Sequence, residues 1–392
     1  MEIDIDSYMK KKIVYLDYAS TTPLDKGVFL AMKKYFSDEF GNSMSVHTFG
    51  RNASVAIEES RYKIASFLNC RPNEIIFTGS ATESNNFAIK GAALAYKDKG
   101  NHILISSLEH PSVYESAFFL KKLGFEVEAV KSTPDGIVDM DDLKRKIKKQ
   151  TILVSVIFVN NEIGTIQPIK EIGQMCKSNG IIFHTDAVQA FGKIKIDVKD
   201  LNIDLLTASS HKIYGPKGCA LLYKKEGVKL EPLLHGGGQE NGLRSSTANT
   251  PAIVGFAKAV EICEKRMEKD KKYIGKLRDF LEENILKKIK DTQINGAKDK
   301  RIYNISNILF KCIDGETLMI GLDIEGICVS TGSACSVTKL EPSKTLLSIG
   351  LTKRDALSSI RFSLGRENTK SDIIKVLKSL EKLTYDLRGR KI

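Results

Sequence analysis

Three side chains able to hold and activate a ligand follow apolar stretches of the sequence. Lys212 lies in SSHKIYGPKG, before two glycine-containing turns, and Asp186 and Gln189 lie three positions apart in HTDAVQ. A lysine in a desolvated or cation-rich pocket has a lowered pKa and attacks aldehydes. A carboxylate without a basic motif nearby is costly to bury, and a protonated pyridine nitrogen is one partner that would justify it.

Donors for a phosphate accompany these groups. Ser209, Ser210 and His211 directly precede the lysine. In TGSATESNN, Ser80 and Thr82 are placed to cap a helix, and the free N–H groups of that turn could also hold a phosphate on the helix dipole. Taken alone, this stretch is explained by helix capping. Phosphate, pyridinium and aldehyde together describe pyridoxal 5'-phosphate.

His110 precedes Pro111 in EHPS. Because proline disfavours helical geometry in the residue before it, we expect the histidine at the end of a strand. Its flat, titratable ring could cover an aromatic ligand or transfer a proton. A core histidine with satisfied hydrogen bonds explains this motif equally well.

The seven cysteines include one in unusual surroundings. None forms a CxxC pair, so we expect neither a metal site nor a disulfide framework. Cys335 lies in STGSACSVTKLEPS, a polar, small-residue stretch typical of a mobile loop, where a reactive thiol has the freedom to move. Buried structural roles are expected for the other six, Cys70, Cys176, Cys219, Cys263, Cys312 and Cys328.

These groups require a sheet to bring them together. Between residues 75 and 225, five apolar stretches each run into a polar cluster: EIIFTGSATES, HILISSLEHPS, ILVSVIFVNNEIG, IIFHTDAVQ and DLLTASSHK. Strands that alternate with helices predict a largely parallel, doubly wound α/β sheet, which binds ligands at the carboxyl ends of its strands. Each cluster alone could be only a helix cap and turn; five in succession favour a shared site.

The pattern of apolar and charged residues changes after Pro251. It predicts long charged helices, then a short mixed region and a final helix. We therefore expect a large domain over residues 15–257 that binds the cofactor. A smaller α/β domain over residues 258–392, completed by residues 1–14, would carry the Cys335 loop.

Composition limits the partners. Lys and Arg number 60 against 48 Asp and Glu, a net charge of +12, but lysines alternate with acids, so we expect a solvated surface and no nucleic-acid partner. The longest apolar run, 152–159, is too short to span a bilayer. The N-terminus MEIDIDSYMKKK has no targeting pattern, which favours the cytoplasm.

Nine motifs in order carry a family resemblance: YLDYASTTPLD, SATESNN, EHPS, VNNEIG, HTDAVQ, SSHKIYGPKG, HGGGQENGLRSST, STGSACS and SIRFSLGR. Together they closely resemble the cysteine desulfurases of the class V aminotransferase superfamily, from Tyr15 to about Arg366. The resemblance implies the pyridoxal-phosphate transferase fold (fold type I, like aspartate aminotransferase). It also implies a homodimer.

The resemblance assigns a role to each matching residue. Lys212 would bind the cofactor covalently, Asp186 would pair with its pyridine nitrogen, Gln189 would hydrogen-bond its phenolic oxygen, and His110 would stack on its ring. The phosphate positions are Ala81, Thr82, Ser209 and His211, with Thr247 reaching the phosphate of the partner subunit. Asn161 and Arg361 match residues near the substrate carboxylate, for which a planar guanidinium is well suited.

The implied reaction converts L-cysteine to L-alanine and leaves the sulfur as a persulfide on Cys335. Lys212 would be the base at Cα, with His110 assisting proton transfer to or from the thiols. The sulfur would pass to an acceptor protein, either an iron–sulfur scaffold or a tRNA-thiolation protein.

Two alternatives remain open. A selenocysteine lyase, or another class V aminotransferase or lyase, would share the fold but would not need the Cys335 loop. A basic binding protein that has kept the fold without activity would not need Lys212, Asp186 and His110 together.

Overall fold

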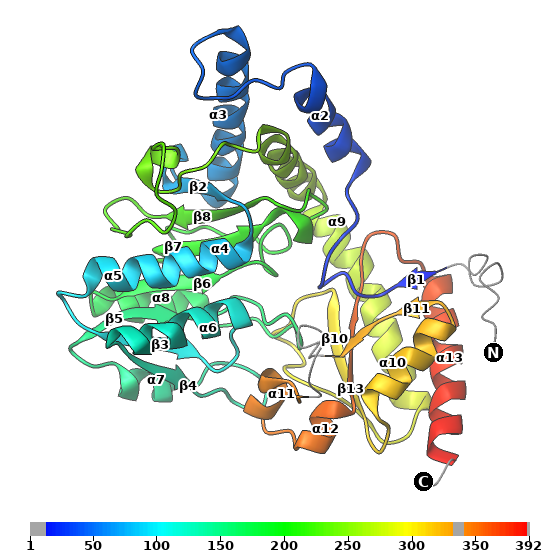
Figure 1. Cartoon of the computed structure of the whole chain (residues 1–392). Helices are drawn as coiled ribbons and strands as arrows, with labels where there is room; N and C mark the ends of the chain where they lie inside the picture. Colours follow the sequence, from blue (N-terminus) through cyan, green and yellow to red (C-terminus); the bar gives the residue numbers. More distant parts are fainter. Residues whose placement is uncertain (1–12, 332–340, 390–392) are drawn as a thin grey trace.

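The computed structural model describes residues 13–331 and 341–389. In this part of the chain the strands form three sheets (Figure 1). The largest has the order β2 (Ile75–Thr78), β8 (Ala220–Lys224), β7 (Leu205–Ser209), β6 (Ile182–Asp186), β5 (Thr151–Ser155), β3 (His102–Ser106) and β4 (Glu126–Val130). No helix in the described ranges is long and apolar enough to cross a membrane.

The large sheet is mainly parallel. β4, β3, β5, β6 and β7 pair in parallel, whereas β8 is antiparallel to both β7 and β2. The central strands are buried along their whole length, as expected for a sheet covered on both faces. The predicted α/β fold with a doubly wound, mainly parallel sheet is confirmed.

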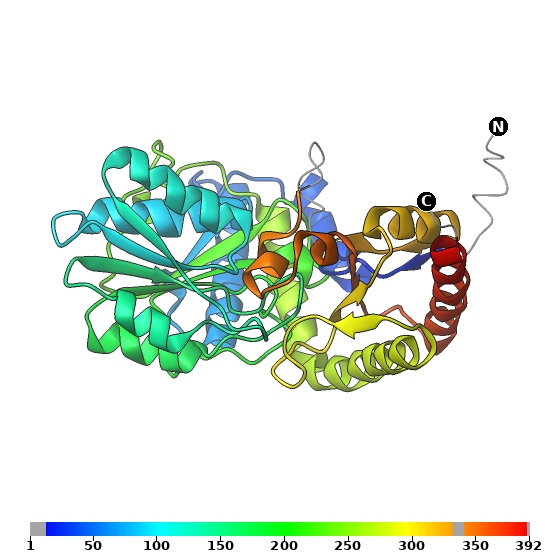
Figure 2. The same cartoon turned by 90° about the horizontal axis from the view of Figure 1, so that it is seen from below.

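Alternate side chains of each strand supply the cores on the two faces of the sheet. Ile75 and Phe77 of β2 belong to one apolar cluster, and Ile76 between them belongs to the other. The helices cover both faces, as Figure 2 shows. They are α3 (Thr48–Leu68), α7 (Met140–Lys146), α8 (Ile169–Ser178) and the start of α9 (Thr250–Lys288) for the first face, and α4 (Ala81–Asn86), the π-turn η2 (Phe87–Gly91), α5 (Ala92–Tyr96) and α6 (Pro111–Leu120) for the second.

A separate core lies in the C-terminal third. An antiparallel sheet with the order β12 (Ser330–Thr331), β13 (Ser359–Ser363), β10 (Ile305–Phe310) and β9 (Thr292–Ile294) packs on α9, α10 (Gly315–Ile324) and α13 (Lys370–Gly389). A two-stranded sheet adds β1 (Val14–Tyr15) beside β11 (Ile327–Cys328). The short helices α11 (Lys344–Ser348) and α12 (Lys353–Leu357) lie between the large sheet and this core (Figure 1).

Helix α9 joins the two cores. Its Asn249 cap accepts a hydrogen bond from Ala252 N–H at 3.2 Å, and Pro251 occupies the first turn, where it costs no backbone hydrogen bond. Its first turns pack on the large sheet and its later turns on the C-terminal core. Because α9 passes residues 257 and 258 without a break, the division of the chain there stays a prediction.

A buried ion pair fixes the C-terminal core, and its removal is the first testable prediction. Arg301 contacts Glu282 of α9 at 2.7 Å, and both side chains are less than 10% exposed. Arg301→Met leaves the Glu282 carboxylate buried without its cation, so we expect the free energy of unfolding to fall by about 3–5 kcal/mol. Urea unfolding followed by circular dichroism measures this change.

The matched control is Lys288→Met. Lys288 also pairs with a glutamate, Glu381 at 2.9 Å, but both side chains are at least 40% exposed. We expect that variant to lose less than about 1 kcal/mol. Equal losses in the two variants would contradict the role given to burial.

Candidate active site

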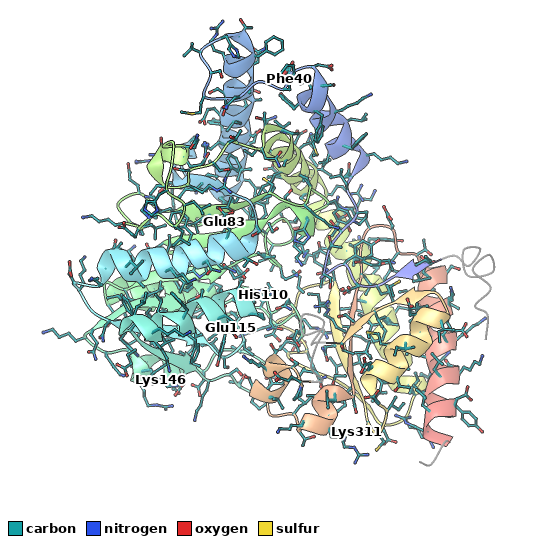
Figure 3. All side chains as sticks on the ribbon, viewed as in Figure 1. Phe40, Glu83, His110, Glu115, Lys146 and Lys311 are labelled. Carbon is teal, nitrogen blue, oxygen red and sulfur yellow. The ribbon has the colours of Figure 1, made fainter. Side chains whose placement is uncertain are left out.

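A cavity of about 520 Å³ lies at the carboxyl ends of the strands of the large sheet. This volume suits a cofactor-sized ligand. Figure 3 shows His110 facing the region between the large sheet and the C-terminal core. Ten of the residues predicted from the sequence line this cavity: Ala81, Thr82, His110, Asn161, Asp186, Gln189, Ser209, His211, Lys212 and Arg361.

The other two predicted residues are placed differently. Thr247 lines a neighbouring cavity of about 220 Å³, whose wall shares Gly79, Gly218 and Cys219 with the first. Cys335 lies outside the described residues, so its role stays a prediction.

Lys212 lies in the turn η4 (Ser210–Lys212) directly after β7. Its Nζ donates to the carbonyl oxygens of Ala19 at 2.7 Å and of Ser20 at 2.6 Å. These carbonyls belong to the N-terminal segment that follows β1. The amine therefore lies at the junction of the large sheet with the N-terminal segment.

The carboxylate of Asp186 is 4% exposed at the end of β6. It accepts hydrogen bonds from Asn85 Nδ2 at 2.7 Å and from Val188 N–H at 3.0 Å. Both donors are neutral, and no ion pair in the described ranges includes Asp186. Its negative charge is therefore oriented and available for a cationic ring nitrogen.

His110 caps α6 and has its ring fixed by the residue after the proline. Its Nδ1 accepts from Ser112 N–H at 3.1 Å. Burial lowers the pKa of His110, the charge of Lys212 lowers it further, and Asp186 opposes both. The ring is neutral near pH 7, and because Nδ1 accepts, its proton is assigned to Nε2.

The phosphate-binding end predicted from the sequence contains His211 and the start of α4. His211 Nδ1 lies 3.1 Å from Thr21 Oγ1, and burial together with Lys212, Lys217 and Lys193 lowers the pKa of His211 to about 4. The turn before α4 is fixed by Glu83, which accepts from Gly79 N–H at 2.8 Å and pairs with Arg244 at 2.7 Å. Glu83 lies at the edge of this region in Figure 3.

Arg361 forms the opposite wall from β13. Its terminal nitrogens donate to Asn161 O at 3.0 Å, Asp17 Oδ1 at 2.7 Å and Ser20 Oγ at 2.8 Å. The guanidinium is thereby oriented beside Asn161, at the end of the cavity predicted to hold the substrate carboxylate.

Comparison with known proteins agrees with this site. The aminotransferase class V model matches residues 14–376. The chain belongs to the aminotransferase class V family. Two curated relatives named cysteine desulfurase IscS, from Dictyoglomus turgidum and Clostridium botulinum, are 47% and 48% identical over 96% of each chain.

Solved structures of the family superpose closely. A NifS-like protein has a TM-score of 0.90 at 34% identity, covering 96% of this chain and 100% of the other. A structure titled SspA in complex with cysteine has a TM-score of 0.81 at 38% identity, covering 90% and 98%. The family predicted from the nine motifs is confirmed.

The site fits pyridoxal phosphate, the cofactor of this aminotransferase class V family. One amine, one buried carboxylate held by neutral donors, a neutral histidine and a cluster of hydroxyl and N–H donors line a single cavity. The carboxylate and the amine match the pyridinium and aldehyde groups of the cofactor, and the donors match its phosphate.

Sequence reasoning missed the residues that hold the predicted ones in place, namely Asp17, Asn85, Glu109 and Lys193. Asp17, Asn85 and Glu109 lie inside the nine motifs, but nothing in the sequence pairs Asp17 with Arg361 or Asn85 with Asp186. Glu109 precedes His110; the residue as a whole is half-buried, and one carboxyl oxygen, Oε1, accepts from Ser106 Oγ and Ile157 N–H, both at 2.7 Å. The other oxygen has no hydrogen-bond partner in the described ranges.

Burial raises the pKa of Glu109 to about 8, with a smaller contribution from Asp186. The folded protein therefore holds a proton that the unfolded chain releases above its ordinary pKa of 4.5. The stability contributed by this proton is complete below about pH 4.5 and is lost as the pH rises through 8.

Glu109→Gln tests this assignment, because glutamine resembles the protonated acid at every pH. We expect the wild type to lose stability relative to the variant between pH 5 and pH 8, by several kcal/mol at most, at about 1.4 kcal/mol per pKa unit. Urea unfolding midpoints of both proteins across this range measure the difference. A difference that is constant with pH would mean that Glu109 is ionised in the folded protein.

Proposed function

We propose that this pyridoxal-phosphate-dependent cysteine desulfurase removes sulfur from L-cysteine, releases L-alanine and holds the sulfur as a persulfide on Cys335. The enzyme class follows from the family and from relatives of that name at 47–48% identity. The observation that carries the chemistry is the convergence of Lys212, Asp186, Gln189 and His110 on one cavity.

Each of these side chains has a task set by its position. Bound pyridoxal phosphate would draw electrons from the substrate Cα and ease the loss of its proton. Lys212 Nζ would take that proton, Asp186 would keep the ring nitrogen protonated, and Gln189 would donate to the phenolic oxygen. Arg361 and Asn161 would bind the substrate carboxylate.

His110 would act as a hydrogen-bond donor in this scheme and assist proton transfer to or from the thiols. Its Nδ1 is occupied by Ser112 N–H, so the neutral ring presents Nε2–H. The thiolate of Cys335 forms the new S–S bond while the C–S bond of the substrate breaks. The carbon side keeps the electron pair and would become alanine by taking up the proton that the Cys335 thiol released, while Lys212 Nζ would return the proton that it took from Cα.

The described residues flanking Cys335 lie near the substrate end of the cavity. Ser330 pairs with Arg361 between β12 and β13, and Ser343 donates to Glu162, the neighbour of Asn161. Cys335 is four residues from Thr331, a reach of at most about 14 Å of extended chain. These attachments support Cys335 as the acceptor of sulfur.

Cys219 is the competing thiol because it also lines the cavity. It is 3% exposed, and burial strongly raises its pKa. A thiol that stays protonated is a poor nucleophile. Cys219 therefore serves as structure in the cavity wall.

The persulfide sulfur passes to an acceptor protein, and iron–sulfur cluster assembly is the use implied by the name of the IscS relatives. Transfer to a tRNA-thiolation protein is the other use proposed. We place the reaction in the cytoplasm, because a free working thiol needs a reducing compartment.

We also propose a homodimer. Large apolar side chains gather on α2 (Lys26–Ser37), on α3 and on their connection, which project from the sheet (Figure 1) and carry Phe40 at their tip (Figure 3). Leu30, Phe36, Phe40 and Val46 are each more than 60% exposed. Several large exposed apolar side chains on successive elements favour an interface, and a second copy would let Thr247 serve its neighbour.

The persulfide is tested by measuring alanine formed from L-cysteine with a reductant present. We expect Cys335→Ala to reduce alanine formation to the background of the assay, because no thiolate then accepts the sulfur. Cys312 is exposed, so the burial expected for it from the sequence was wrong; Cys312→Ala, which removes this thiol, should keep wild-type activity.

Other outcomes of this assay are equally informative. If Cys219→Ala stops forming alanine and Cys335→Ala still forms it, the thiol that accepts the sulfur is Cys219. Full activity in every variant would favour a lyase without a persulfide, such as one acting on selenocysteine.

The dimer is tested by sedimentation of Leu30→Asp. A buried charge at an interface centre costs 2 kcal/mol or more, so we expect the dimer dissociation constant to rise by about 30-fold or more. Ile324→Asp on α10 is the control, because Ile324 is 58% exposed but lies away from this surface. An unchanged dimer in Leu30→Asp would rule out this face.

A further inference from the structure

We propose that Lys193 is a positioning residue that fixes the side-chain amide of Gln189, so that the NH2 group faces the phenolic oxygen of the cofactor. This inference rests on the proposed assignment of Gln189 to that oxygen. It adds a function for a lysine that does not line the main cavity.

The contacts form a short chain of hydrogen bonds. Lys193 Nζ donates to Gln189 Oε1 at 2.9 Å and to Gln189 O at 3.3 Å. At the other end of the amide, Gln189 Nε2 donates to Ala19 O at 2.8 Å. Lys212 Nζ donates to the same oxygen at 2.7 Å, so the amide nitrogen of Gln189 lies beside the reactive amine.

Chemistry permits only one orientation of this amide. The Lys193 amine donates in either protonation state, and a backbone carbonyl accepts and has no donor. Oε1 must therefore face Lys193 and Nε2 must face Ala19. The second N–H of Nε2 remains for the cavity, which Gln189 lines.

The local sequence brings Lys193 back onto Gln189. In QAFGK, Gly192 has φ +73°, and a Cβ there would lie 2.7 Å from Ile213 Cγ2, so the tight turn requires glycine. Lys193 N–H donates to Ala190 O at 3.0 Å and closes this turn. The ammonium group is thereby placed one helical turn from the amide.

A structural role alone does not explain a lysine at this position. Lys193 is 9% exposed and makes no ion pair with a carboxylate in the described ranges. Burial and the charge of Lys212 lower its pKa to about 7. Its other neighbours, around a small cavity of about 20 Å³, include Cys263, Asp270 and Arg366. An apolar side chain would fill the space without the cost of burying an amine.

The orientation has a measurable effect on the bound cofactor. An N–H donor stabilises negative charge on the phenolic oxygen and so lowers the pH at which the chromophore loses its proton. Without Lys193 only the bond from Nε2 to Ala19 O holds the amide, so the amide can rotate about that bond and its second N–H can leave the phenolic oxygen. The titration midpoint should then rise.

The experiment follows the visible absorbance of the holoenzyme against pH, without substrate. We expect Lys193→Met, which keeps the length and removes the donor, to raise the midpoint by about one pH unit or more. Gln189→Ala should raise it as well. Lys193→Gln, which can turn either way, should give a smaller rise and replaces Lys193→Met if the methionine variant does not fold.

The double variant separates orientation from charge. If Lys193 acts through Gln189, adding Lys193→Met to Gln189→Ala should move the midpoint little further. Fully additive shifts would mean that the ammonium acts through its charge alone and would overturn the proposal. An unshifted Lys193→Met beside a shifted Gln189→Ala would also overturn it.

A different result is expected if Gln189 does not contact the phenolic oxygen. An unchanged midpoint in Gln189→Ala would remove Gln189 from the phenolic oxygen and with it the inference about Lys193. Alanine formation from L-cysteine by the wild type would still stand in that case, so the two failures are distinguishable.

Discussion

The carbonyl oxygens of Ala19 and Ser20 are the point on which the geometry of the site depends. Lys212 donates to both, and Gln189 donates to the first. Arg361 donates to Ser20 Oγ and to Asp17 in the same segment. This segment follows β1, which pairs with β11 in the C-terminal core. The Lys212 amine, the Gln189 amide and the Arg361 guanidinium are therefore all positioned by this segment. A shift of the segment would displace all three groups.

The electrostatics of the cavity follow from the groups gathered there. Burial lowers the pKa of His211, and the nearby charges of Lys212, Lys217 and Lys193 lower it further, so the field around the predicted phosphate is positive. Asp186, by contrast, is held by the neutral donors Asn85 and Val188 N–H. The cavity thus has cationic groups beside the predicted phosphate and a buried carboxylate at the end of β6. A molecule with a phosphate and a protonated ring matches this distribution better than a neutral ligand would.

The residues at the strand ends could be predicted from the sequence, because each polar cluster directly follows an apolar run. Parallel strands place their carboxyl ends at one edge of the sheet, so a shared site could be predicted as well. Asp186, Ser209 and Lys212 came from this rule, and the family resemblance added Asn161 and Arg361. The supporting residues were not predictable. Asn85 contacts Asp186, which lies 101 positions later in the sequence, and nothing in the sequence around Glu109 indicates that its carboxyl oxygens are buried. Such contacts depend on the packing of separate elements, which local patterns do not record.

The placement of the thiols separates two tasks with opposite demands. Proton transfer at Cα needs groups held to within a fraction of an ångström, and Lys212, Asp186 and His110 all lie at the ends of buried strands or helices. Sulfur transfer to another protein needs a thiol that a partner can reach. Cys219 meets the first demand and fails the second, because the cavity wall encloses it and burial keeps it protonated. Cys335 belongs instead to the connection between β12 and α11, whose described ends attach beside Arg361 and Asn161. If Cys335 carries the sulfur, as proposed, the thiol that gives sulfur away and the groups that move protons belong to different segments of the chain.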